Sequence, residues 1–232
     1  MKILKIISIY FCCLLCVCNS VFAQKKNKNF SGEIIYTLTY NNLPTELSAF
    51  SSLLPSQLTI YIKDSTFLIQ TLIGEQSIKI IKKIGDNNIM LLFNMTGITI
   101  ATELSSNDSN IITNKIKDWS FTHQDSSFTF EKNTETKTIC GYTCQGYDIY
   151  KSDDEGKHQL ATLFTCPNFI AWPKEGLPFY IKTNDDNEQS MSITMEISKI
   201  KHIKLSNDIF SIPQNAIRMT ISDLLNSIGG ND

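Results

Sequence analysis

The chain has 232 residues, of which 42% are hydrophobic and 19% are charged, and its formal net charge is −2 at pH 7. Both fractions are ordinary for a globular protein, and a chain of this length can bury a sizeable core. The slightly negative charge argues against a nucleic-acid-binding protein, because such proteins carry a basic patch.

The first 23 residues have the pattern of a secretory signal peptide. Lys2 and Lys5 give a positive start, an apolar run covers residues 6–17, and the segment ends with Val21-Phe22-Ala23. Signal peptidase accepts such small or modest residues just before the bond it cuts, so we expect cleavage between Ala23 and Gln24. The apolar run is shorter than the roughly 20 residues that span a bilayer. The sequence therefore predicts an exported protein without a transmembrane span, located in the periplasm, at the outer membrane or outside the cell.

A lipid-anchored form is the alternative. Cys16 and Cys18 lie where a lipid-modified cysteine could stand. Lipoprotein processing prefers a small residue just before that cysteine, and Leu15 and Val17 stand there instead. A mature chain that starts at Gln24 would carry no lipid anchor.

Apolar residues at every second position dominate the processed chain. After a short flexible segment (24–29), we expect one domain that covers residues 30–230. Such alternation is typical of strands with one wet and one apolar face. It occurs in at least five segments: 34–40, 58–62, 67–73, 89–93 and 191–197.

About ten such segments with short polar turns predict an antiparallel meander. A sheet of this size must curl or close, because flat open sheets leave costly edges. The expected fold is therefore mainly β (α+β), a strongly curved antiparallel sheet or half-barrel of about ten strands.

Two segments have helical spacing instead. Four apolar residues recur at intervals of four, three and four between Pro44 and Pro55: Leu43, Leu47, Phe50 and Leu54. This spacing predicts a short amphipathic helix. We expect it to lie on the concave side of the sheet, where it is a candidate lid over a ligand.

The second helix is expected over residues 220–228. Thr220 can cap it, and Asp223 lies near its positive end. Gly229 and Gly230 end it. Its apolar stripe, which we also expect on the concave side, consists of Ile221, Leu224, Leu225 and Ile228.

Four stretches in this order resemble an uncharacterised family of exported Bacteroidetes proteins, a domain of unknown function: 30–36 (FSGEIIY), 54–63 (LPSQLTIYIK), 136–144 (TKTICGYTC) and 207–213 (NDIFSIP). Such proteins look like the lipoprotein-carrier (LolA-like) architecture, a strongly curved antiparallel sheet with helices over its concave side. The resemblance spans nearly all of the processed chain. It implies no catalytic residues, because the family has none established.

Three cysteines remain after cleavage, Cys140, Cys144 and Cys166. Oxidising conditions outside the cytoplasm favour one disulfide and one free thiol. Cys144 and Cys166 each lie 11 residues from Glu155, so they would oppose one another if the flanking segments pair across a turn there. Cys140 is the alternative partner of Cys144, because a three-residue loop between them could also close. We favour the Cys144–Cys166 disulfide.

No constellation for catalysis or metal binding stands out. The histidines (His123, His158 and His202) are far apart and lack the spacing of a metal motif. The acidic stretches 153–155 and 185–186 lack the order of a calcium loop. The sequence therefore predicts a protein that is not an enzyme, with no catalytic residues, no metal and no cofactor.

Asp64-Ser65-Thr66 resembles the acceptor for O-glycosylation in Bacteroidetes, with Ser65 as the modified residue. A tight turn between two strands explains the same three residues equally well.

Two functions fit these expectations. The first is a non-catalytic cell-envelope protein that binds or carries a hydrophobic ligand (a lipid, an acyl chain or a lipoprotein) in the concave face of the sheet. The alternative is a structural or protein-interaction module with a filled core and no ligand, whose partner would be another envelope protein. Neither function involves nucleic acid.

Overall fold

The computed structural model describes residues 30–86, 88–105, 128–153, 156–166, 169, 177–183 and 191–224. The predicted signal peptide, its predicted cleavage site between Ala23 and Gln24, and segment 24–29 lie outside these residues. No helix among the described residues is long and apolar enough to cross a membrane.

The described chain is mainly β, as predicted. Its strands are β1 (Gly32–Asn41), β2 (Gln57–Lys63), β3 (Thr66–Ile73), β4 (Gln76–Lys83), β5 (Ile89–Met95), β6 (Ile98–Leu104), β7 (Phe128–Ile139), β8 (Tyr142–Asp153), β9 (Gly156–Cys166), β10 (Leu177–Thr183), β11 (Ser192–His202) and β12 (Ile217–Met219). Short helical segments accompany them: α2 (Thr45–Ser48), η2 (Ser51–Leu53) and η3 (Asp208–Phe210).

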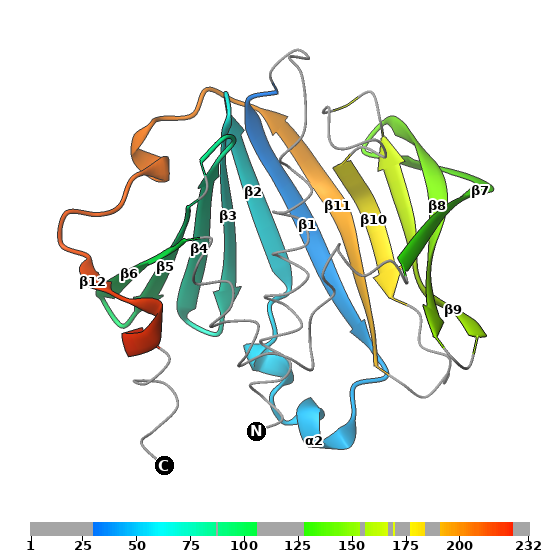
Figure 1. Cartoon of the computed structure of the whole chain (residues 1–232), viewed down its shortest axis with the longest axis horizontal. Coiled ribbons are helices and arrows are strands. Elements are labelled where there is room, and N and C mark those ends of the chain that lie inside the picture. The colour runs from blue at the N-terminus through cyan, green and yellow to red at the C-terminus, as the bar shows by residue number, and fades with distance from the viewer. Residues whose placement is uncertain are drawn as a thin grey trace.

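The twelve strands form one curved sheet in the order β12-β6-β5-β4-β3-β2-β1-β11-β10-β9-β8-β7 (Figure 1). Neighbours are antiparallel, except that β12 runs parallel to β6. The edge strands β12 and β7 do not pair, so the sheet is unclosed. The predicted curved antiparallel sheet is confirmed.

The predicted count of about ten strands was too low. With three residues, β12 is too short to show alternation. The middle of β7 is polar in sequence, and a bulge between Lys132 and Thr136 interrupts its pairing with β8. Neither strand therefore carries the period-two apolar pattern on which the count rested.

The sheet curls most strongly at its β7 end. In the sheet order, β9 and β10 separate the β7–β8 hairpin from β11. Nevertheless the Cys140 thiol, in the turn of this hairpin, donates to the Ile197 carbonyl of β11 at 3.4 Å. The Lys137 ammonium of β7 lies 3.1 Å from the Glu196 carboxylate of β11 and 4.0 Å from the centre of the Tyr180 ring of β10. The hairpin tip is thus folded over β10 and β11.

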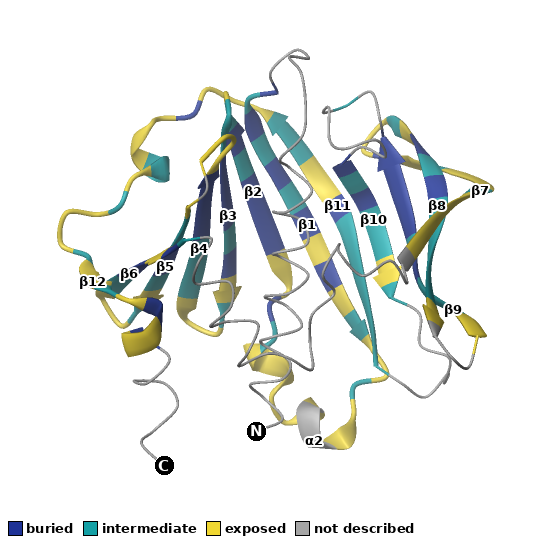
Figure 2. Cartoon of the chain, in the orientation of Figure 1, coloured by how far each residue is buried: buried dark blue, intermediate teal, exposed yellow. Residues whose placement is uncertain are grey.

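A row of directly opposed apolar side chains crosses five neighbouring strands, from β1 to β5. We call it the apolar row: Ile34, Ile60, Ile69, Ile80 and Leu91. Their exposed fractions are 0, 2, 4, 1 and 1%. Figure 2 shows buried residues alternating with less buried ones along β1, as the sequence pattern predicted. The row forms the centre of the main core.

The opposite face of β3–β6 carries a second, smaller core that the sequence did not predict. Leu68, Ile81, Leu92 and Ala101 are buried there. The chain after β11 folds back over them, with Ile209, Phe210, Ile212 and Ala216 packed against the cluster. Both faces of β3 are therefore covered, and three consecutive residues, Phe67-Leu68-Ile69, are buried.

The prediction of one amphipathic helix between Pro44 and Pro55 was wrong. In place of one helix with a buried stripe, the structure has the four-residue α2 and the three-residue η2, which lie at the end of the sheet (Figure 1). Of the predicted stripe, Leu54 packs against the main core, Phe50 is 39% exposed, and the side chain of Leu47 lies outside the described part. Leu43 is half-buried.

Serines account for the interruption of this helix. Ser48 donates through its hydroxyl to the Thr45 carbonyl at 2.7 Å. Such local side-chain bonds compete with the helical backbone ladder. The following turn is closed by hydrogen bonds of 3₁₀ type, from Leu53 N to Phe50 O and from Leu54 N to Ser51 O. A single short helix is also marginal without packing along its length.

The last predicted helix begins where expected. The Asp223 amide donates to the Thr220 hydroxyl at 3.1 Å, and this hydroxyl donates to the Asp223 carboxylate at 2.6 Å. Thr220 is therefore the N-cap. Ile221 and Leu224 are buried in the main core. The rest of the predicted helix (Leu225, Ile228, Gly229 and Gly230) lies outside the described residues.

Candidate functional site

The apolar row and its surroundings are the candidate site. The residues of the main core come from eleven strands and are almost all apolar. Among the described residues, five from outside the strands pack on this core: Phe30, Leu54, Phe169, Ile221 and Leu224. The site can hold an apolar group by dispersion and by exclusion of water, and it offers few polar partners.

Aromatic rings gather at one end of this core. Phe169 lies at the centre of the group, with ring centroids 4.8 Å from Tyr142, 5.1 Å from Phe30 and 5.2 Å from Phe179. The His202 ring stands 5.0 Å from Phe30. Tilted and edge-on pairs at these distances stabilise one another beyond their buried area.

The sequence did not predict this aromatic cluster. Phe169 is the one described residue of the stretch 167–173. The rings belong to segments far apart in the chain, and they meet because the β7–β8 hairpin is folded over. The alternation of apolar residues within one strand does not predict contacts between rings from distant segments.

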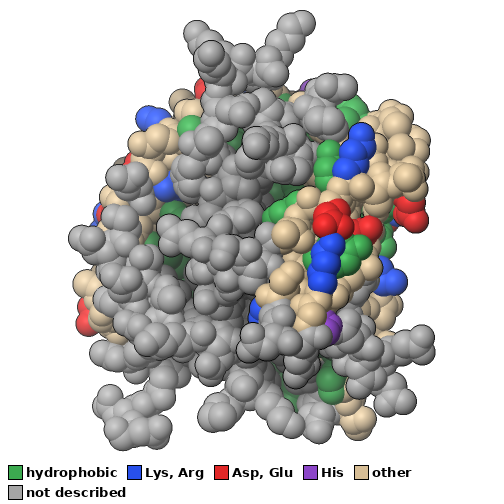
Figure 3. Space-filling view, turned by 45° about the vertical axis from the view of Figure 1, so that its right-hand side comes forward, with side chains coloured by type: hydrophobic (Ala, Val, Ile, Leu, Met, Phe, Trp, Pro, Cys, Tyr) green, Lys and Arg blue, Asp and Glu red, His purple; other side chains and the backbone are tan. Residues whose placement is uncertain are grey.

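The surface over β7–β9 is polar. Figure 3 brings this side forward and shows Lys and Arg side chains beside Asp and Glu side chains. Lys157 pairs with Glu131 at 2.6 Å across the β7–β9 region, and both side chains are largely exposed. An exposed pair of this kind contributes at most about 1 kcal/mol. This surface is hydrated and is no candidate for binding an apolar ligand.

The structure brings Cys144 and Cys166 to adjacent strands. Gln145 of β8 opposes Thr165 of β9, so the next position along each strand brings Cys144 opposite Cys166. Both cysteines are buried, and all three thiols of the described chain are free here. Cys140 is exposed in the β7–β8 turn.

Burial raises the pKa of two of these thiols, Cys140 and Cys144. It raises the pKa of Cys144 from its ordinary value of 9.0 to about 12, and the neighbouring Cys166 adds to the effect. Burial and the Glu196 carboxylate raise the pKa of Cys140. A thiol with a raised pKa is a poor nucleophile at neutral pH, so Cys140 and Cys144 do not have the chemistry of a catalytic cysteine.

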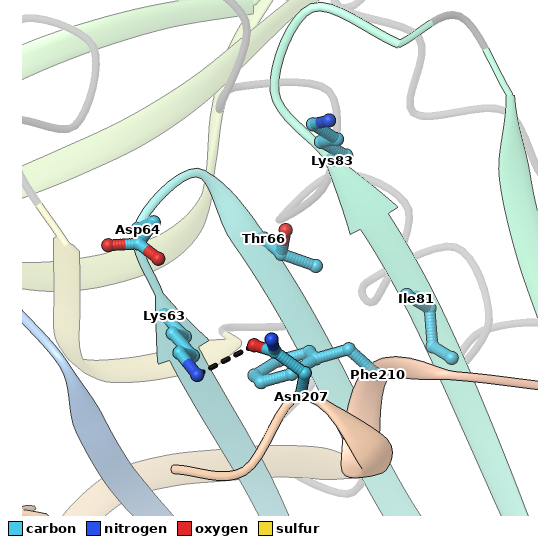
Figure 4. Close-up of a pocket in the computed structure, with 7 residues that line it drawn as sticks. All are labelled: Lys63, Asp64, Thr66, Ile81, Lys83, Asn207 and Phe210. Carbon is cyan, nitrogen blue, oxygen red and sulfur yellow. Dashed lines mark hydrogen bonds between the residues drawn. The ribbon is translucent and has the colours of Figure 1, made fainter. Parts of the chain in front are cut away.

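A pocket of about 310 Å³, with charged residues at its rim and apolar side chains in its wall, lies on the face of the second core (Figure 4). The Lys63 ammonium donates to the Leu205 carbonyl at 2.8 Å and to the Asn207 side-chain oxygen at 2.6 Å. Lys63 thus holds the segment after β11 onto β2. The other lining residues are Asp64, Thr66, Ile81, Lys83 and Phe210.

Ser65 stands in the turn between β2 and β3, between Asp64 and Thr66, which line this pocket. Asp64 adopts a left-handed conformation with φ 53°, and the Ser65 carbonyl accepts a hydrogen bond from the Ile84 amide at 2.7 Å. The geometry is that of a tight turn. O-glycosylation of Ser65 stays a prediction.

Within the described part of the chain, no three His, Cys, Asp or Glu side chains gather in a way that could hold a metal ion. His158 lies on β9 and His202 at the end of β11, whereas His123 is outside the described residues.

No protein-family model matches the chain, and no curated protein matches its sequence. Solved structures similar to it include the lipoprotein LppX of Mycobacterium tuberculosis, at 10% identity and a TM-score of 0.40 over 76% of this chain and 89% of that one. A LolA superfamily protein from Nitrosomonas europaea matches at 11% identity and a TM-score of 0.35, over 81% of this chain and 92% of that one. LprF of Mycobacterium bovis matches at 12% identity and a TM-score of 0.33, over 80% of this chain and 90% of that one.

These structures include a LolA superfamily member. The identities and TM-scores are low, so the proposals that follow rest on the residues of this chain alone.

Proposed function

We propose that the protein is an exported, non-catalytic binding protein of the cell envelope that holds a hydrophobic ligand against the apolar row. The ligand class is an acyl chain, a lipid or the lipid part of a lipoprotein. Its location would be the periplasm, the outer membrane or the outside of the cell. Membership of the exported Bacteroidetes family stays a prediction.

The observation that carries this proposal is the apolar row itself. Four strand spacings of about 4.8 Å give it a length of roughly 19 Å. Along that length it offers isoleucine and leucine side chains without a charged group. A long, uncharged surface of this kind suits a hydrocarbon chain.

The row is covered in this structure, since its residues are at most 4% exposed. A ligand would therefore have to displace what covers it. We propose that the segment carrying Leu43, Leu47, Phe50 and Leu54 acts as a lid in this exchange. Leu54 already packs on the main core, and Phe50 nearby is exposed.

Lipid extraction and fatty-acid binding test the proposal. The protein, purified in its processed form from cells that export it, is extracted with organic solvent and analysed by mass spectrometry. It is also titrated with a dansyl-labelled fatty acid. We expect either a co-purified lipid or saturable binding of the fatty acid. Absence of both would refute the proposal.

Two neighbouring leucines on opposite faces of β5 give matched variants. Leu91 belongs to the apolar row and Leu92 to the second core, and their exposed fractions are 1 and 4%. Phenylalanine at either site overpacks a core to a similar degree. We expect Leu91→Phe to weaken fatty-acid binding and Leu92→Phe to leave it unchanged. Equal effects would place the ligand elsewhere.

The same burial favours the second candidate function, a structural or protein-interaction module with a filled core. In that case the apolar row is permanent core, and the partner would be another envelope protein. Purified protein would then carry no lipid and take up no fatty acid, while both phenylalanine variants would be destabilised alike.

A further inference from the structure

Exposed apolar side chains gather at one end of the β1–β6 and β12 part of the sheet. We call this the apolar end. It consists of segments 41–57, 71–78, 93–100 and 214–219, where β1, β3 and β5 finish and where β2, β4, β6 and β12 begin. Figure 1 shows α2 and the β3–β4 turn at this end. Its exposed large side chains, with their exposed fractions, are Phe50 39%, Leu53 45%, Leu72 56%, Ile98 51% and Ile217 52%.

The members of this group are near one another by contact and by register. A Cβ on Gly74, in the β3–β4 turn, would lie 3.2 Å from the Leu53 side chain. Ile217 of β12 opposes Ile100 of β6, two residues after Ile98. The exposed residues therefore lie at the same end of neighbouring strands, with Leu72 on the face of the second core and Ile98 on the face of the main core. Exposed apolar residues gathered in this way mark an interaction surface.

The apolar end is nearly free of charge. Its four segments hold three charged residues, Glu46, Glu75 and Arg218, while serine, threonine, asparagine and glutamine fill the other polar positions. The turns at the opposite end of the sheet contrast with it, since they carry Lys63, Asp64, Lys82, Lys83 and Asp86.

We propose that the apolar end docks on the surface of a phospholipid bilayer. The boundary of the hydrocarbon accepts leucine, isoleucine and phenylalanine and rejects ionised groups. An end with few charges fits that medium better than it fits a typical charged protein surface.

The apolar end is also continuous with the main core. Leu54, which follows the exposed Leu53, packs on that core, and so does Ile100 of β6. This part of the inference rests on the proposed function: a hydrophobic ligand would pass between the bilayer and the apolar row through this end. Docking itself does not depend on a ligand.

Co-sedimentation with vesicles tests the docking. The probe is a vesicle of pure phosphatidylcholine, and the protein is used in its processed form, with the N terminus checked by mass spectrometry. The test variant is Leu72→Thr/Ile98→Thr. The matched control at the opposite end is Ile84→Thr/Ile203→Thr, whose parent residues are 37 and 42% exposed.

We expect the Leu72→Thr/Ile98→Thr variant to lose at least about tenfold in partitioning to vesicles, because two large apolar contacts are removed. The control should partition like the unmodified protein, and melting temperatures should agree among all three. Partitioning should also be unaffected by added salt, because few charges take part.

Three outcomes would overturn the proposal. They are an unmodified protein that does not sediment with vesicles, a test variant that partitions like its control, and self-association that the test variant abolishes while vesicle binding is absent. Fatty-acid binding is measured without vesicles, so failure of the proposed function and failure of docking are separate results.

Discussion

The Tyr36 hydroxyl of β1 donates a hydrogen bond of 2.8 Å to the Pro178 carbonyl of β10, across the intervening strand β11. Pro178 stands at the point where the register between β10 and β9 shifts. Such a bulge leaves backbone groups without ladder partners. The Tyr36 hydroxyl supplies the partner from within the core, where the residue is 1% exposed.

We therefore expect Tyr36→Phe to lower the free energy of unfolding by about 1–2 kcal/mol, because the carbonyl loses its partner in a buried site. Urea denaturation followed by circular dichroism measures the change. Tyr147→Phe on β8 is the control, since the Tyr147 hydroxyl makes no hydrogen bond to any residue that the structure describes. Equal losses in the two variants would contradict the assigned role.

Thr165 gives a prediction of the opposite sign. Its side chain on β9 is fully buried, and its hydroxyl oxygen has no hydrogen-bond partner among the residues that the structure describes. Valine has the same shape without the hydroxyl. We expect Thr165→Val to raise the free energy of unfolding by about 1 kcal/mol, since it removes an unpaired buried polar group. Urea denaturation checks the value.

Thr162, on the same strand, is the control for this substitution. Its hydroxyl donates to the Asp148 carboxylate at 3.1 Å and accepts from the Gln159 amide at 3.1 Å. Thr162→Val should therefore destabilise the protein by roughly 0.5–1.5 kcal/mol. If both valine variants shift stability in the same direction, the hydroxyl of Thr165 has a partner after all.

The strands were predictable because their signal is local. Tyr36, Leu38 and Tyr40 alternate with threonines, and a sheet of this kind must bury one of the two faces. The Thr220 cap was predictable for the same reason, because its hydroxyl acts on an amide three residues away. Such features need no knowledge of the rest of the chain.

The remaining features depend on distant parts of the chain. The second core exists because residues 209–216 pack over Leu68 and Leu92. The spacing of those leucines does not predict which segment covers them. The ring of Phe169 meets Tyr142 and Phe179 only after the β7–β8 hairpin folds over. Helical spacing from Leu43 to Leu54 was misleading, because the serines between them favour local hydrogen bonds over a continuous helix.

The cysteine pairing is open to direct measurement. In a glutathione redox buffer we expect Cys144 and Cys166 to form a disulfide, with their two protons and two electrons passing to oxidised glutathione. The bond would close a loop of 23 residues and stabilise the fold by about 3 kcal/mol in the chain-entropy view. Peptide mapping without reductant identifies the bridge.

Two variants separate the alternatives for this bridge. Cys140→Ser should keep the disulfide, and Cys166→Ser should abolish it. A bridge between Cys140 and Cys144 in the unmodified protein, or three free thiols after oxidation, would refute the pairing.

In protein kept reduced, the buried Cys144 thiol predicts a loss of stability at alkaline pH. Its pKa is raised from 9.0 to about 12, so the folded state holds the proton more tightly than the unfolded state does. The contribution is complete below pH 9 and declines as the pH rises toward 12, by up to about 1.4 kcal/mol per pH unit. The pKa of Cys140 is also raised from 9.0 and that of Tyr36 from 10.0, so in the interval from pH 9 to 10 the difference from Cys144→Ala isolates the Cys144 thiol. Urea denaturation across that interval should give a slope that Cys144→Ala reduces, and identical slopes in the two proteins would mean that Cys144 is ionised as readily in the folded chain as in the unfolded one.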